Sequence, residues 1–430
     1  MIIICEPICL NVSHEKVNSG FLYGLHLAFP EEGILFYADI THIEAIKKIL
    51  IHDNVYIEKL EYVPIKLKTA NTIFSISGFY LLFKKIFLDA IRNKTNKVFF
   101  LSFSSIILYV LKKLKSEHRF FDFKITLVLH GGFENIAGKR INSIPFELPR
   151  RMIHKKTISE KFKQIKLIEL PKKIIIILSQ KYISKYIKFI ENISLKLFPE
   201  KKILLWKHSP DFKFISLSPH VTRNAMEYID VKYLNINTII LPTIFVEPDF
   251  QINNDHPKFA VFGWGDPLMF HNILYLLSMR KIKNPYEIRI IGANCNGSEG
   301  FSNVTCFNLG RMLYRSEMES FVKDIDYFLI LYNKDKYRLS CSGSILEAIS
   351  YIKPVIHFEN DCIDYFNNPE NPIGISCSSI EEFVSTLNDI ITNYNKYLPK
   401  IEIYKKNIIK LRQDCAIENS ISKFKKSFTW

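Results

Sequence analysis

Small residues at 340–344 precede a helix-length segment that ends at Lys353-Pro354 and leads into an apolar run. Ser342, Gly343 and Ser344 lie at the centre of this turn. Backbone N–H groups at a helix start, with the positive end of the helix dipole behind them, bind phosphate oxygens such as those of a nucleotide-sugar diphosphate. Ser344 and Glu347 also have the spacing of a capping box, in which the glutamate serves only its own helix terminus. The spacing favours neither interpretation over the other.

A second cluster of reactive side chains follows an apolar run that ends at Leu129. His130 is followed by Gly131 and Gly132, which allow the backbone to turn close to a ligand, and Glu134 comes two residues later. His and Glu both act as general bases near neutral pH when their surroundings adjust their pKa values. The alternative is that His130 is a hydrogen-bonded structural residue, which is the commoner role of a lone histidine after a strand.

These residues must be positioned by short apolar runs that alternate with helix-length segments, a pattern typical of α/β proteins with parallel sheets. A length of 430 residues predicts two domains. The polar stretch 246–258 divides them into 1–245 and 259–415, and 416–430 is expected to form a C-terminal helix that returns to the first domain. We expect strands at 2–5, 34–38, 98–102, 125–129, 214–217, 239–241, 259–262, 288–291, 304–307, 327–331 and 354–358.

The composition, with 48% hydrophobic and 23% charged residues, excludes a disordered or low-complexity chain. The net charge is +15, and residues 1–245 carry all of the excess, with 37 basic and 21 acidic residues. Such a charge indicates an anionic partner. Segment 150–202 interleaves 15 basic residues with apolar ones. It is either a basic amphipathic surface for anionic lipid headgroups or a solvated surface helix.

The cysteines and the apolar stretches bear on the cellular compartment. Eight cysteines are scattered without a Cys-x-x-Cys pair or zinc-finger spacing, so we expect reduced thiols and no metal site. The N-terminus lacks the basic and apolar regions of a secretory signal. The longest apolar stretches fall well short of a membrane-spanning helix. We therefore expect a cytoplasmic protein.

Several motifs together resemble the GT-B glycosyltransferases, and most closely the large group-1 type, over most of the chain. Residues 259–265, a strand followed by a turn with Gly263 and Gly265, look like the start of the donor domain of that family. Residues 303–310, which end at Gly310, are similar to the segment that holds the nucleotide base. The turn at 340–344 occupies the place of the family's phosphate-binding turn, and all pieces occur in the family's order.

The resemblance implies two Rossmann-like parallel-sheet domains that face each other across a cleft. By position, Ser342, Gly343 and Ser344 would hold the donor phosphates, and Glu347 would bind the donor ribose.

The acceptor would lie against the N-terminal domain. In the family, the loop after the first strand helps to bind the acceptor, which indicates His14 and Asn18 here. Gly131 and Gly132 would form the acceptor side of the second cluster. An inverting transfer needs one base, for which His130 and Glu134 are the candidates, with His14 and Glu15 next.

The chain departs from the family's pattern at two places. Retaining members carry a second glutamate eight positions before the one at 347, and this chain has Leu339 there. The basic residues that often clamp the diphosphate after the Gly263 turn are absent. Arg311 and Arg315 are candidate replacements, and a solvated surface arginine is the commoner alternative.

The resemblance implies a metal-independent enzyme without a cofactor, in which the nucleotide sugar is a substrate. The expected acceptor is a glycan or lipid-linked glycan of bacterial surface polysaccharide or lipooligosaccharide synthesis. We expect the protein to be peripheral on the inner face of the cytoplasmic membrane and to bind no nucleic acid. The alternatives are a nucleotide-sugar 2-epimerase, whose Gly-Thr-Arg start is missing here, and a non-catalytic basic module that binds membrane or nucleic acid.

Overall fold

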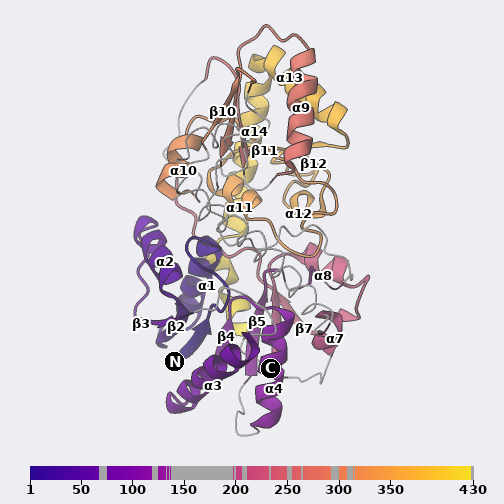
Figure 1. The fold of residues 1–430 in the computed structure, drawn as a ribbon. Coiled ribbons are helices and arrows are strands. Elements are labelled where there is room, and N and C mark those ends of the chain that lie inside the picture. The colour runs from indigo at the N-terminus through magenta and orange to yellow at the C-terminus, as the bar shows by residue number, and fades with distance from the viewer. Residues whose placement is uncertain are drawn as a thin grey trace, which may run out of the picture.

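The computed structural model describes residues 1–66, 75–118, 124–131, 133, 134, 136, 197, 200–205, 211–231, 234–248, 254–262, 265–291, 300–307, 313 and 315–427. They form two α/β domains, one above the other in Figure 1, with both chain ends in the lower domain. Segment 150–202 lies almost entirely outside the described residues. Four of the expected site residues also lie outside them, namely Gly132, Gly263, Gly310 and Arg311.

The described part of the N-terminal domain contains a parallel sheet with the strand order β3-β2-β1-β4-β5-β6-β7. Its strands are β1 (Ile2–Cys5), β2 (Ile34–Asp39), β3 (Leu60–Ile65), β4 (Lys97–Phe100), β5 (Lys124–Leu129), β6 (Phe212–Ser216) and β7 (Asn235–Thr238). Its helices are α1 (Glu15–Ala28), α2 (Ile40–His52), α3 (Ile76–Arg92), α4 (Ser105–Glu117), α7 (Glu200–Leu205) and α8 (Pro219–Ala225). Helices cover both faces of the sheet, so Ile2 and Ile4 of β1 belong to one hydrophobic core and Ile3 and Cys5 to the other.

The described part of the C-terminal domain repeats this architecture with the strand order β10-β9-β8-β11-β12-β13, again entirely parallel. Its strands are β8 (Lys258–Phe262), β9 (Glu287–Ile291), β10 (Val304–Cys306), β11 (Tyr327–Ile330), β12 (Val355–Phe358) and β13 (Gly374–Cys377). Its helices are α9 (Pro267–Met279), α10 (Arg315–Val322), α11 (Gly343–Ser350), α12 (Asp361–Asp364), α13 (Ile380–Thr392) and α14 (Tyr394–Asp414).

The chain ends by returning to the N-terminal domain through η3 (Ile417–Ser420) and α15 (Ile421–Lys426). Phe424 of α15 is fully buried, and its ring packs so closely on α1 that a Cβ at Gly24 would lie 2.3 Å from it. Thr126 of β5 donates a hydrogen bond to the backbone oxygen of Ser427 at 2.8 Å. Figure 1 shows this yellow segment beside α1 in the lower domain.

Three strands differ from the sequence-based expectation, and all three are at sheet edges. Strands β3 and β13 were not predicted, and β7 lies at 235–238 rather than at 239–241. An edge strand is covered less completely than a central one, so its sequence carries a weaker apolar signal. Strand β7, for example, has the sequence NINT and no fully buried residue.

Two further expectations concern the cysteines and the membrane. Cys306 is in a disulfide bond, whereas Cys5, Cys9, Cys341, Cys362, Cys377 and Cys415 are free thiols. The expectation that every cysteine is reduced is therefore wrong for Cys306, because spacing in the sequence does not show which sulfur atoms meet in the fold. Among the residues that the structure describes, no helix has both the length and the apolar character to cross a membrane.

Candidate active site

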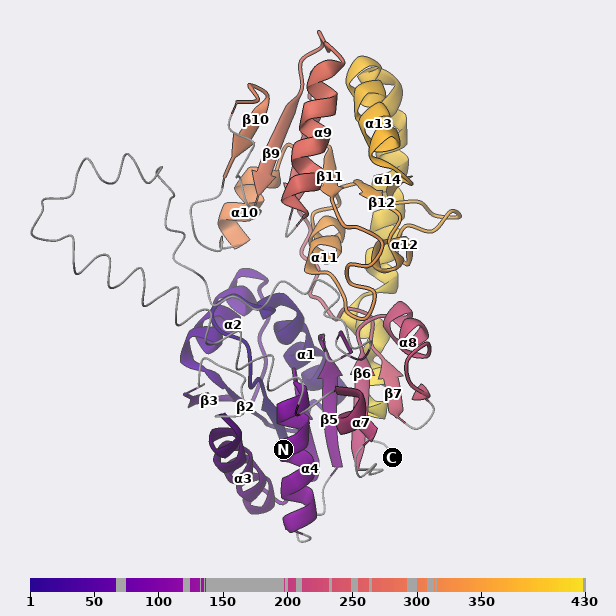
Figure 2. The same ribbon diagram turned by 45° about the vertical axis from the view of Figure 1, so that its right-hand side comes forward.

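Loops at the carboxyl ends of strands from both sheets meet at the domain interface, where α1 and α8 lie beneath α11 and α12 in Figure 2. Glu134, after β5, accepts a hydrogen bond from the Ser340 hydroxyl, after β11, at 2.5 Å. His220, after β6, donates from Nε2 to the backbone oxygens of Tyr337 and Ser340, each at 3.0 Å, and its Nδ1 lies 2.7 Å from the Ser218 hydroxyl oxygen. These contacts place the second cluster of the sequence beside the turn that precedes α11.

The turn before α11 is held by hydroxyl groups. Ser342 caps the helix, and its Oγ accepts a hydrogen bond from the Ser344 N–H at 3.1 Å. The buried Tyr332 hydroxyl lies 2.9 Å from Ser342 Oγ and donates to Ser344 Oγ at 2.8 Å. A Cβ on Gly343 would have no atom within 4 Å. The backbone at Gly343 therefore adjoins open space at a helix N-terminus, which suits a phosphate group.

Glu347, one turn further along α11, forms an ion pair with the other domain. Lys16 of α1 donates from Nζ to Glu347 Oε2 at 2.9 Å and to the Ser350 hydroxyl at 2.7 Å. Burial lowers the pKa of Lys16 to about 8, although the neighbouring Glu347 opposes this shift. The capping-box interpretation is wrong, because Ser342 rather than Ser344 caps the helix and the Glu347 carboxylate contacts Lys16.

Arg315, a candidate for the missing diphosphate clamp, is held by acidic residues from both domains. Its Nε donates to Glu319 Oε1 at 3.0 Å and lies 3.7 Å from Asp53 Oδ1. Its guanidinium carbon lies 5.7 Å from the centroid of the Tyr351 ring. Arg315 is buried, so these contacts favour a role in joining the domains over the solvated alternative.

His130 lies at the end of β5, and its ring stacks on that of His14 with 4.4 Å between the centroids. Its Nε2 is buried and has no hydrogen-bond partner among the described residues. Burial lowers the pKa of His130 well below its ordinary value, and the neighbouring His14 and His42 add to this shift. The imidazole is therefore neutral near pH 7, which is the form that accepts a proton. His14 has a left-handed backbone conformation, with φ at 54°, where α1 begins.

Asn18, expected to contact an acceptor, is fully buried in a network around Glu6. Glu6 follows β1, and its Oε1 accepts hydrogen bonds from two backbone N–H groups of the next loop and from the Ser102 hydroxyl. Its Oε2 accepts from Asn18 Nδ2 at 3.1 Å, and that nitrogen also lies 3.0 Å from His42 Nε2. Asn18 is therefore a buried member of this network, and its expected contact with an acceptor stays a prediction.

The expected glycines have different surroundings. A Cβ on Gly265 would lie 3.2 Å from Leu331 Cβ, so this turn must pack closely against the end of β11. The backbone N–H of Asp266 donates to the Leu331 oxygen at 3.1 Å. A Cβ on Gly131 would be in ordinary contact with the Glu134 side chain, at 3.6 Å. Gly265 therefore helps to join β8 to β11, whereas Gly131 does not need its lack of a side chain for packing.

Solved structures with the same fold cover the whole chain. A glycosyltransferase from Rickettsia africae superposes with a TM-score of 0.58 at 11% identity, over 100% of this chain and 99% of that one. The lipopolysaccharide outer core galactosyltransferase WaaB has a TM-score of 0.54 at 12% identity over 99% and 98%. Anabaena Alr3699/HepE in complex with UDP-glucose has a TM-score of 0.54 at 11% identity over 99% of both chains. The chain has the GT-B fold. No protein-family model and no curated protein matches the sequence.

The GT-B architecture expected from the sequence motifs is thus confirmed. Sequence reasoning missed three of the residues that shape the interface, namely Glu6, Lys16 and His220. Glu6 had one usable signal, since a charged residue directly after a fully apolar first strand must be paired when the loop is buried. Lys16 and His220 had none, because their partners are more than 100 residues away in the sequence.

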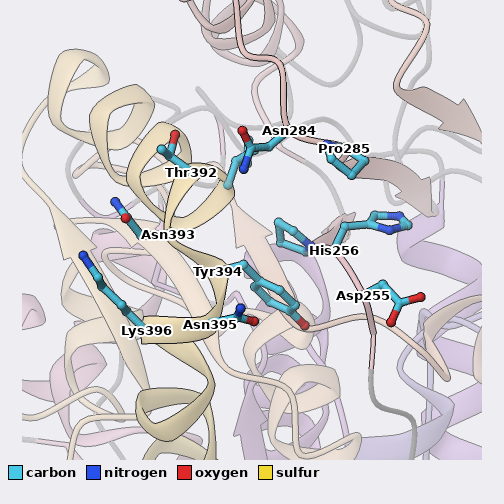
Figure 3. Close-up of a pocket in the computed structure, with 11 residues that line it drawn as sticks. Asp255, His256, Asn284, Pro285, Thr392, Asn393, Tyr394, Asn395 and Lys396 are labelled. Atoms are coloured by element: carbon cyan, nitrogen blue, oxygen red, sulfur yellow. The ribbon is translucent and has the colours of Figure 1, made fainter.

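A cavity of 310 Å³ lies away from this interface in the GT-B structure. Figure 3 shows His256 and Pro285, which precede β8 and β9, across from Tyr394 at the start of α14. It is therefore at the amino ends of the strands, opposite the end that carries Gly265 and the turn before α11. The ligand-binding end of a parallel α/β sheet is the carboxyl end, so we place the candidate active site at the domain interface.

Proposed function

We propose that this protein is a group-1-type glycosyltransferase that moves a sugar from a nucleotide-sugar donor to a glycan or lipid-linked glycan of a bacterial surface polysaccharide. The observation that carries the proposal is the hydrogen bond between Glu134 and Ser340. It brings a candidate base of one domain beside the anion-binding helix start of the other. The galactosyltransferase activity of WaaB and the UDP-glucose bound by Alr3699/HepE support the choice of reaction class.

On the donor side, the N–H groups at the start of α11 would receive the diphosphate. The open space at Gly343 supports this role, and the hydroxyl network of Ser342, Ser344 and Tyr332 holds the turn in place. Glu347 would accept hydrogen bonds from the ribose hydroxyls through Oε1, since Oε1 has no hydrogen-bond partner among the described residues and Lys16 occupies Oε2.

On the acceptor side, His130 would remove the proton from the attacking hydroxyl. Its neutral Nε2, which has no partner in the described part of the chain, supports this choice over Glu134, whose Oε1 already accepts a hydrogen bond from Ser340. Leu339, which stands where retaining members have their second glutamate, is buried and apolar. Its character supports an inverting transfer that uses a single base.

We also propose that the protein works at the inner face of the cytoplasmic membrane. The excess positive charge of residues 1–245 supports attraction to anionic lipid, at about 1 kcal/mol for each basic residue near the surface. Wild type should float with anionic vesicles at low salt, and a variant with Lys181, Lys185 and Lys188 changed to Glu should float less. Equal flotation of the two proteins would remove segment 150–202 from the proposal.

The central test is nucleotide binding and sugar transfer by wild type and by Glu347→Ala. Saturation at 100 times the dissociation constant adds about 2.7 kcal/mol of stability, so a thermal-shift screen against UDP, GDP, ADP and their sugar conjugates identifies the donor class. Glu347→Ala should lose the shift and the transfer activity. Glu402→Ala, which removes an exposed carboxylate of α14, is the matched control and should keep both. An active, nucleotide-binding Glu347→Ala variant would contradict the donor-site assignment.

A further inference from the structure

The start of α1 lies at the domain interface, where it contacts α11 of the C-terminal domain. Lys16, the second residue of α1, is 6% exposed, and the Ser350 hydroxyl that it contacts belongs to a residue that is 1% exposed. A lysine is rarely buried to this extent unless its charge is paired. Here the Glu347 carboxylate provides the opposite charge at 2.9 Å.

The ion pair with Lys16 uses one oxygen of the Glu347 carboxylate and leaves the other oxygen for a ligand. The Lys16 ammonium contacts Oε2, and Oε1 accepts no hydrogen bond from the described residues. An ionised carboxylate has about four lone-pair sites, so one oxygen can be fixed by an ammonium group while the other receives hydroxyl groups. Side chains that bind ligands are most effective when neighbouring hydrogen bonds hold them in one orientation.

We propose that Lys16 is a positioning residue of the donor site, which fixes the Glu347 carboxylate for the ribose of the donor from the opposite domain. The inference rests on the proposed function, because it takes Glu347 as the ribose ligand. Nucleotide affinity then depends on a residue of the acceptor domain, and the donor site is complete only when the two domains are in contact.

A purely structural role for Lys16 makes a different prediction, and the chain offers a control for it. His52 of α2 and Glu319 of α10 form a second polar contact between the domains, with 3.1 Å between Nε2 and Oε2. This pair joins the same two domains without touching Glu347. If Lys16 only held the domains together, its loss and the loss of His52 would affect nucleotide binding in the same way.

The experiment measures dissociation constants by calorimetry for the nucleoside diphosphate, among UDP, GDP and ADP, that binds wild type most tightly, and for its 2′,3′-dideoxy analogue. Lys16→Met should weaken the ribonucleotide about tenfold and leave the dideoxy analogue, which has no hydroxyls for Glu347, unchanged. Glu347→Gln should show the same selectivity, and the double variant should lose no more than either single variant. His52→Ala should leave both ligands unchanged.

Conservative variants keep the test decisive if Lys16→Met does not fold. Lys16→Arg should retain most of the ribonucleotide affinity, and Lys16→Gln, which keeps a donor without the charge, should fall between the two. Wild-type affinity in Lys16→Met or Lys16→Gln, or equal weakening of the ribonucleotide and the dideoxy analogue, would overturn the inference. A wild-type protein that binds none of the three nucleotides would instead overturn the proposed function.

Discussion

The donor-side turn, residues 332–344, and the acceptor-side turn, residues 130–134, are held in opposite ways. In the donor-side turn, Tyr332, Ser342 and Ser344 satisfy one another within a dozen residues of sequence. In the acceptor-side turn, His130 stacks on His14 from another element, and its Nε2 has no partner among the described residues. The hydroxyl network of the donor-side turn is local, whereas the ring of His130 packs on a residue that is distant in the sequence.

Under the proposed function, this difference separates phosphate binding at the donor-side turn from proton transfer at the acceptor-side turn. A group of hydroxyls that already satisfy one another can hold a helix start rigid, which suits the recognition of a fixed phosphate group. A buried nitrogen without a partner costs free energy, and such a cost is tolerated where the nitrogen has a reactive role. We therefore expect the donor-side turn to bind the nucleotide and the acceptor-side turn to carry the reaction, as the proposed function requires.

The largest expected effect that tests this division is that of His130→Ala. Loss of the base should lower the rate of transfer by about 10² to 10⁴, whereas the nucleotide dissociation constant should not change, because the donor-side turn does not need His130. Single-turnover kinetics combined with calorimetry measures the two quantities separately.

Glu134→Gln is the comparison for this experiment. Glutamine keeps an acceptor for the Ser340 hydroxyl, so the contact between the domains should survive while the carboxylate base is lost. If Glu134→Gln is as slow as His130→Ala, the assignment of the base to His130 is not unique. Near wild-type rates in both variants would mean that the acceptor pocket is not at this turn.

The number of neighbours around each strand explains how much of the fold was predictable from the sequence. Central strands such as β1 and β5 were found because both of their faces are buried, and their sequences are almost wholly apolar. The edge strands β3, β7 and β13 were missed or misplaced. Only one neighbour and part of one face constrain an edge strand, so polar residues such as those of β7 are tolerated and the pattern weakens.

The candidate site was predictable to the extent that its interactions are local. The helix start at 342–344 was found because small residues before a helix carry a direct physical signal. The capping box at Ser344 was wrong, because the helix begins at Gly343, so that Ser342 is its cap and Ser344 lies inside it, and because Lys16 contacts the Glu347 carboxylate. No local pattern indicates a partner that is 331 residues away.

A smaller effect is expected for Ser342→Ala, and it tests whether the donor-side turn binds a ligand or only begins a helix. Loss of the cap should cost about 1 kcal/mol of stability and, because the turn loosens, should weaken nucleotide binding about tenfold. Ser379→Ala is the matched control, since Ser379 caps α13 through the Glu382 N–H at 3.1 Å. It should lose similar stability and no nucleotide affinity. Denaturant unfolding would measure the loss of stability in both variants, and calorimetry would measure the loss of nucleotide affinity. If Ser342→Ala binds the nucleotide as tightly as Ser379→Ala does, the turn has a capping role only.

The smallest expected effect is the dependence of nucleotide affinity on pH, which should arise on the donor side alone. The pKa of Lys16 is lowered to about 8, chiefly by burial, so its ammonium group loses its proton as the pH rises through 8 and no longer holds Glu347. The pKa of Glu15 is raised to about 8, by burial and by Glu347, so Glu15 gains negative charge over the same range. Arg315 and Asp53 also face Lys16, and Arg315 keeps its positive charge because Glu347 and Tyr351 raise its pKa against the effect of burial.

Both changes make the surroundings of Glu347 more negative, and the affinity for a nucleoside diphosphate should fall about fivefold between pH 7 and pH 9. Glu15→Gln should remove one part of this dependence and Lys16→Met the other, which separates the two groups. His130→Ala should leave it unchanged, because the pKa of His130 is shifted downwards and its imidazole stays neutral throughout this range. A wild-type affinity that does not change between pH 7 and pH 9 would show that the charge of Lys16 plays no part in donor binding.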